Sequence, residues 1–232
     1  MDRSLKPLDV VYGSALGVDR QRVLRNTYAL LALSMVPTVL GAWAGLAFGF
    51  SFFAGSPLIG LLVFMGVAFG FFFAIEKFKN SGVGVLLLLG FTFFMGLMLS
   101  RLLGAALNLS NGAQLITMAF GGTGLVFVSM AAWAQTTKRD VSSMGKWLMV
   151  GAVVLMVAAI ANIWLQLPAL HLAVSTLAVV VFSVFIMYDL KRIIDGGETN
   201  YVTATLSVYL NVYNVFSSLL QLLMAFTGGD RE

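Results

Sequence analysis

One carboxylate and one row of polar side chains stand out near the C-terminal end of the sequence. Asp189 lies close to the end of an apolar run that starts near residue 169. After a polar hinge at residues 195–200, a second apolar run carries polar residues at spacings of 4, 4, 3, 4 and 3, namely Thr203, Ser207, Asn211, Asn214, Ser218 and Gln221. These spacings place all six side chains on one face of a helix, in a row about 27 Å long at 1.5 Å per residue. That length is close to the thickness of the hydrocarbon core of a bilayer.

The chemistry open to this row is proton or cation binding inside a membrane. Polar groups without partners in hydrocarbon are costly, so the row must face other helices or water. Asp189 is the one carboxylate placed to reach it, and an acid within a membrane is a candidate functional residue. We predict a gate, or a proton- or cation-binding site, formed by Asp189, Asn211, Asn214, Ser207 and Ser218.

Two less specific interpretations remain open for the same residues. Asp189 can be an acid at the membrane interface that is neutralised by Lys191 or Arg192. The polar row can hydrogen-bond between helices, although its length favours a water-filled cavity over such contacts.

Composition identifies the class of protein. The chain has 232 residues, of which 59% are hydrophobic and only 10% are charged, as expected for a polytopic membrane protein. It has no cysteine and a single histidine, His171, which excludes disulfides and cysteine metal sites and argues against histidine-rich metal sites and serine–histidine hydrolases. We expect a protein that is not an enzyme, has no resident metal or cofactor, and binds no nucleic acid.

Seven apolar segments are each long enough to cross a bilayer as a helix. They cover residues 27–50, 57–75, 82–103, 113–134, 147–166, 169–192 and 201–225. The fold class is therefore an all-α membrane protein with seven transmembrane helices in residues 27–225. Residues 1–26 form an expected cytoplasmic N-terminal tail, and residues 226–232 form a short C-terminal tail on the other side.

Charge predicts the orientation. Twelve of the fourteen Lys and Arg residues lie in the first 26 residues or in the connections after the second, fourth and sixth segments. The positive-inside rule places these on the cytoplasmic face, so the N-terminus is cytoplasmic and the C-terminus is outside.

Glycines four residues apart occur in the first two segments. Gly41, Gly45 and Gly49 have this spacing, as do Gly66 and Gly70. The pattern allows close helix approach, and we favour packing within the bundle over dimerisation. The oligomeric state is not predicted.

Two stretches resemble a known family. TKRDVSSMG at 137–145 and GGETNYVTATLSVYLNVYNVF at 196–216 are similar to the Bax inhibitor (TMBIM) superfamily. RNTY at 25–28 and NIWLQLPALHL at 162–172 look more narrowly like its bacterial YccA branch.

The resemblance implies a seven-helix bundle with the C-terminal helix at its centre, in the bacterial inner membrane. It also implies a regulator of the membrane-anchored, ATP-dependent protease FtsH that is itself a substrate engaged through its cytoplasmic tail. Arg20, Arg22 and Arg25 in that tail are then the candidate partner-binding residues.

Other members of the superfamily imply an alternative, a pH-sensitive calcium leak channel gated by two aspartates, with transient Ca2+ as its ligand. Asp189 matches the first of these aspartates, but the second position is Asn211, which cannot ionise. The arginine that the family places in the second segment has no clear counterpart here. Both departures favour the protease regulator over the channel.

Overall fold

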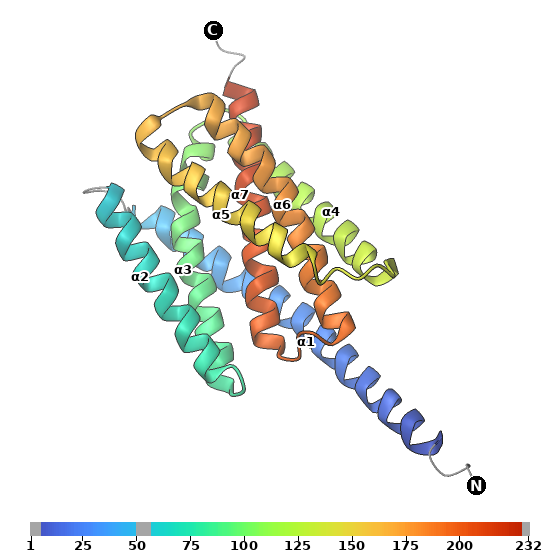
Figure 1. Ribbon diagram of the computed structural model, residues 1–232. Helices are drawn as coiled ribbons and strands as arrows, with labels where there is room; N and C mark the ends of the chain where they lie inside the picture. Colours follow the sequence, from blue (N-terminus) through green and yellow to red (C-terminus); the bar gives the residue numbers. More distant parts are fainter. Residues whose placement is uncertain (1–5, 50–56, 229–232) are drawn as a thin grey trace.

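The computed structural model describes residues 6–49 and 57–228 of the chain, and these residues fold into a bundle of seven helices (Figure 1). The helices are α1 Lys6–Ala47, α2 Pro57–Phe78, α3 Gly82–Leu107, α4 Gly112–Thr136, α5 Met144–Leu165, α6 Pro168–Asp195 and α7 Tyr201–Gly228. Each contains a stretch that is long and apolar enough to cross a membrane, as the sequence predicted.

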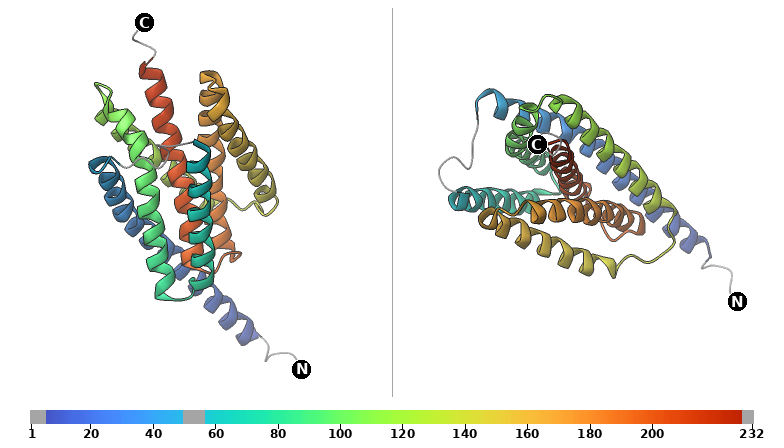
Figure 2. Two further views of the ribbon diagram at one scale, coloured as in Figure 1. Left: turned by 90° about the vertical axis from the view of Figure 1, so that its left-hand side faces the viewer. Right: turned by 90° about the horizontal axis from the view of Figure 1, so that it is seen from above.

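Most helix boundaries agree with the expected segments to within four residues, but α1 differs. It begins at Lys6 and continues without a break through the segment that we expected to be a polar tail. Residues 19–47 of α1 are long and apolar enough to span a membrane. The first turns of α1 project beyond the rest of the bundle (Figures 1 and 2). The ends of the expected first segment and of the C-terminal tail lie outside the described residues.

Local sequence explains several helix ends. Pro168 opens α6 in the first turn, where its missing N–H is not needed. Gly196 closes the same helix with φ +84°, a left-handed conformation that favours glycine. Asn200 then caps α7, because its side-chain oxygen accepts hydrogen bonds from the backbone N–H groups of Val202 and Thr203 at 2.9 and 3.2 Å. The polar hinge of the sequence is thus a tight turn between two membrane helices.

The C-terminal helix α7 occupies the centre of the bundle. It packs against α1, α2, α3, α4 and α6, and the view along the bundle shows it surrounded by these helices (Figure 2, right). Tyr209 near its middle is 1% exposed and lies against the ring of Phe91 from α3. The central position expected from the family resemblance is therefore confirmed.

Glycines allow α1 and α3 to touch backbone to backbone. A Cβ atom added at Gly41 would collide with the carbonyl oxygen of Phe93, and one added at Gly96 would collide with that of Thr38. By contrast, Gly66 and Gly70 have no atom near their missing Cβ positions. The packing predicted within the bundle therefore holds for the glycines of α1 that face α3, and not for those of α2.

The outer surface is apolar, as a surface against acyl chains should be. Large side chains such as Phe73, Leu86 and Trp147 are mostly exposed. Helix α5 has little of its surface covered, and its main contact is with α6. These features agree with a protein whose surroundings are lipid and not water.

Candidate functional site

Asp189 and Asn211 lie side by side where α6 meets α7. The side-chain nitrogen of Asn211 donates a hydrogen bond of 2.7 Å to a carboxylate oxygen of Asp189. Asn211 is buried and Asp189 is half-buried, between the buried residues Met187 and Leu190. The row of polar residues on α7 therefore reaches the acid on α6, as the sequence predicted.

The basic residues that follow Asp189 have other partners. Lys191 forms an ion pair of 2.8 Å with Asp195, and Arg192 lies 3.9 Å from the carboxylate of Glu198. The guanidinium of Arg192 also lies over the ring of Tyr188, 5.9 Å from its centre. The described hydrogen-bond partner of the Asp189 carboxylate is therefore the neutral amide of Asn211, and not one of the two basic residues.

The other residues of the predicted site have separate roles in the packing. Asn214 donates a hydrogen bond of 2.8 Å to the carbonyl oxygen of Leu210 in its own helix. Ser218 is buried, whereas Ser207 is half-buried. Of the predicted set, Asn211 is the residue whose described hydrogen bond reaches Asp189.

A cavity does exist in the bundle, but it lies on the other side of α7. Its α7 lining consists of Tyr209, Val212, Tyr213 and Phe216. At 100° per residue these side chains point roughly opposite to Asn211 and its neighbours. The sequence favoured a water-filled cavity along the polar row; the structure instead brings the row to α6 and places the described cavity elsewhere.

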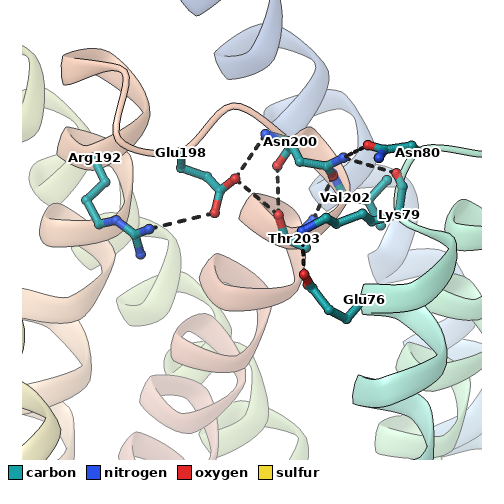
Figure 3. A network of polar contacts seen from close by, with 8 residues as sticks. All are labelled: Glu76, Lys79, Asn80, Arg192, Glu198, Asn200, Val202 and Thr203. Atoms are coloured by element: carbon teal, nitrogen blue, oxygen red, sulfur yellow. Dashed lines mark hydrogen bonds and ion pairs between the residues drawn. The ribbon is translucent and has the colours of Figure 1, made fainter.

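The turn between α6 and α7 is tied to the connection between α2 and α3 (Figure 3). The side-chain nitrogen of Asn200 donates to the side-chain oxygen of Asn80 at 2.8 Å and to the carbonyl oxygen of Lys79 at 3.2 Å. A carboxylate oxygen of Glu198 accepts from the N–H of Asn200 at 2.9 Å and from the Thr203 hydroxyl at 3.2 Å. This network fixes the N-terminal end of α7, two to three turns from Asn211.

The connection between α4 and α5 supports the same region from the other side. Gly145 is the last residue of the TKRDVSSMG motif. A Cβ atom at this position would collide with the hydroxyl of Tyr188. Within this connection, Asp140 accepts a hydrogen bond of 2.8 Å from the N–H of Ser142, which lowers the pKa of the Asp140 carboxyl group. Through Gly145, the motif thus contacts Tyr188, the residue that precedes Asp189.

The three arginines of the expected tail lie on α1 and are exposed. The Arg20 guanidinium lies directly over Gly196, where a Cβ atom would come within 2.7 Å of its Nε. At Arg20, α1 therefore passes next to the turn between α6 and α7.

Sequence reasoning missed a buried hydroxyl network that joins three helices. The Tyr209 hydroxyl lies 2.9 Å from that of Thr38 on α1 and 3.4 Å from the carbonyl oxygen of Thr92 on α3. All three residues are buried. Tyr209 lies off the polar row, and a tyrosine among apolar residues gave no signal that its hydroxyl would have partners.

The arrangement offers one carboxylate beside one amide. Such a pair can bind a proton, or supply two oxygen ligands to a cation, but cannot form an acid dyad that shares a proton. Among the described residues, no three His, Cys, Asp or Glu side chains are grouped so that they could hold a metal ion.

Comparison with known proteins identifies the family. The family described as "Inhibitor of apoptosis-promoting Bax1" matches residues 20–228. The chain is 40% identical to the "Modulator of FtsH protease YccA" of Escherichia coli K12, over 87% of this chain and 89% of that protein. It is also 40% identical to an uncharacterised protein of Neisseria meningitidis serogroup A, over 96% of this chain and 99% of that protein. A third relative, an uncharacterised membrane protein of Vibrio cholerae, is 37% identical over 92% of this chain and 93% of its own. With its seven membrane-spanning helices and central C-terminal helix, the chain belongs to the Bax inhibitor family of multi-pass membrane proteins.

Proposed function

We propose that this protein is a non-enzymatic regulator in the bacterial inner membrane that binds and modulates the FtsH protease complex and is itself a substrate of it. The observation that carries the proposal is the 40% identity, along almost the whole length of both chains, to a protein named as a modulator of that protease. Because the similarity extends along most of both chains, a shared partner is the simplest expectation.

The shape of the N-terminal region supports engagement by a protease. The first turns of α1 project from the bundle (Figure 1). Short helical segments without packing partners are marginally stable in water, and such ends are where proteolysis starts. The sequence analysis expected the protease to engage a polar tail. In the structure the corresponding segment is the projecting end of α1, and we propose that the protease engages this end.

The distribution of charge supports a cytoplasmic location for this end. The connections after α2, α4 and α6 lie at the end of the bundle from which α1 starts, and they carry most of the remaining basic residues (Figure 1). By the positive-inside rule, the N-terminal end of α1, with Arg20, Arg22 and Arg25, would then be cytoplasmic.

The proposal is tested by reconstitution. FtsH complex and this protein are placed together in proteoliposomes, and degradation of an unrelated membrane substrate of the protease is followed. We expect degradation to slow as this protein is added, while the protein is itself consumed. Unchanged degradation of the substrate at saturating amounts, without association of the two proteins, would refute the proposal.

A second candidate function, a cation leak pathway, is favoured by one observation, the Asp189–Asn211 contact between two central helices. A carboxylate held by a hydrogen bond from a neighbouring helix can act as a gate if protonation releases the contact. Calcium flux into proteoliposomes, compared between the intact protein and Asp189→Asn, decides this role. Equal flux at every pH would remove Asp189 from any such mechanism.

A further inference from the structure

A long apolar groove runs along the side of the bundle between α1 and α4. Its volume is about 1030 Å³, and α7 forms its floor through residues such as Tyr213 and Phe216. Helices α1 and α4 both pack against α7, and they form the two walls of the groove. Neither Asp189 nor Asn211 lines it, so it is separate from the candidate site described above.

The groove is as long as a bilayer is thick. Its lining extends from Tyr28 to Leu46 on α1 and from Ile116 to Gln135 on α4. At 1.5 Å per residue each wall measures about 27 Å, which matches the hydrocarbon thickness of about 30 Å. An acyl chain belongs to one leaflet and would fill about half of this length, so the natural occupant is a structure that crosses the whole membrane.

The rim of the groove faces lipid. Four large side chains on its two walls, Val39 and Trp43 of α1 and Phe120 and Val128 of α4, are each between 64% and 69% exposed. An occupant can therefore enter sideways from the bilayer without any helix moving aside.

Small residues on α4 allow an incoming helix to approach closely. Gly124 lines the groove, and a Cβ atom added there would meet no other atom within 4 Å. Ala132, about two turns along, is also exposed within the lining. Small residues on a helix surface allow other membrane helices to approach closely.

One end of the groove carries polar groups. The hydroxyl oxygen of Tyr28 is buried without a hydrogen-bond partner among the described residues. Gln135, which also lines the groove, is the polar side chain next to this hydroxyl. A polar side chain on the occupant at this level would hydrogen-bond to the Tyr28 hydroxyl, which favours one register of docking.

We infer that this groove receives a transmembrane helix of the protease complex named in the proposed function, on which this inference rests. Because the groove is open along its rim, one face of such a helix would lie against the walls and the other face would stay in contact with lipid. The partner is recognised by its length, by a face of small residues and by one polar side chain near the end marked by Tyr28 and Gln135.

Photo-crosslinking locates the occupant. A photoreactive amino acid replaces Val128 at the rim of the groove, and in a control protein it replaces Val154, which is equally exposed but lies on α5. Membranes that contain the FtsH complex are irradiated, and adducts are identified by mass spectrometry. We expect position 128 to crosslink to a transmembrane peptide of the complex and position 154 to react with lipid. Lipid adducts alone at position 128, or an adduct with a second copy of this chain, would overturn the inference.

A matched pair of glycine variants tests the fit. Gly124 and Gly121 both have free space at the missing Cβ, but only Gly124 lines the groove. We expect Gly124→Leu to reduce the crosslink from position 128 and the co-purification of the protease at least tenfold, whereas Gly121→Leu leaves both unchanged. Thermal unfolding of both variants in detergent checks that each folds.

The outcomes separate the groove from the function. If the intact protein co-purifies with the protease but Gly124→Leu does so equally well, the groove inference fails and the proposed function stands. If the intact protein does not associate with the protease at all, the proposed function fails and the groove inference fails with it.

Discussion

The side chain of Asn211 on α7 donates a hydrogen bond of 2.7 Å to the carboxylate of Asp189 on α6. The contact adds a polar link to the extensive apolar packing of α6 against the central helix α7. It also sets apart two neighbouring asparagines, because Asn211 bonds across the helix interface while Asn214 bonds within its own helix.

The contrast between the two asparagines gives the first prediction. Asn211→Ala leaves the half-buried carboxylate of Asp189 without its described partner, and it should lower the free energy of unfolding by about 1–3 kcal/mol. Asn214→Ala, which removes a bond within one helix, is the control and should have a much smaller effect. Denaturant unfolding of both variants in the same detergent measures the difference. Equal effects would mean that the contact with Asp189 adds nothing to stability.

Replacing the amide by an acid gives a pH-dependent variant. Asn211→Asp would place two carboxyl groups at hydrogen-bond distance, where they can share one proton but cannot comfortably carry two charges. The folded state then depends on the shared proton, so stability should be present at low pH and fall as the pH rises. Melting temperatures between pH 5 and pH 8 should decline more steeply for this variant than for the intact protein. A parallel dependence in both proteins would contradict the prediction.

The close contact between the backbones of α1 and α3 leaves no room for a side chain at Gly96. Gly96→Ala forces a methyl group against the carbonyl oxygen of Thr38, and we expect a loss of about 1–3 kcal/mol from overpacking. Gly66→Ala is the matched control, because its Cβ has free space and alanine is the better helix former by about 1 kcal/mol. Thermal unfolding should therefore move in opposite directions for the two variants.

Asn200, in the turn before α7, has two roles that variants can separate. It caps α7, and it bonds to the α2–α3 connection. Asn200→Ala removes both the helix cap and the bond to the α2–α3 connection, and the cap alone contributes about 0.5–2 kcal/mol. Asn80→Ala keeps the cap and the bond from Asn200 to the carbonyl oxygen of Lys79, and removes only the bond between the two asparagine side chains. Hydrogen exchange in the first turn of α7 should accelerate strongly in the first variant and weakly in the second. Similar acceleration in both would show that the bond between the connections, and not the cap, holds this end.

The projecting start of α1 should control the lifetime of the protein in the membrane. Deletion of residues 2–19 removes the projecting turns and retains Arg20 with its contact to Gly196. If the protease grips this segment, the shortened protein should persist several times longer in cells that contain FtsH and act as a lasting inhibitor. A shortened protein that disappears as quickly as the intact one would exclude the N-terminal end as the point of engagement.

The limits of sequence-based reasoning are clear at α1 and at the polar row. Hydropathy predicted a membrane-spanning segment within α1, but it could not show that the helix starts at Lys6, because polar residues are compatible with both helix and coil. The spacing of the row placed Asn211 on the face of α7 that meets Asp189. It could not distinguish a face that lines a cavity from one that contacts a helix, since both require polar residues at the same spacing.

The sequence by itself determined the number of helices, their membrane character and the pairing of Asp189 with the polar face of α7. These follow from the length, hydropathy and periodicity of continuous segments, which are local properties. Only the tertiary structure decided that Gly41 packs against α3 while Gly66 faces open space, that Tyr209 bonds to Thr38, and that a bilayer-long groove separates α1 from α4. These features depend on which helices become neighbours and at what angle, and residues far apart in the chain carry no local signal of that choice.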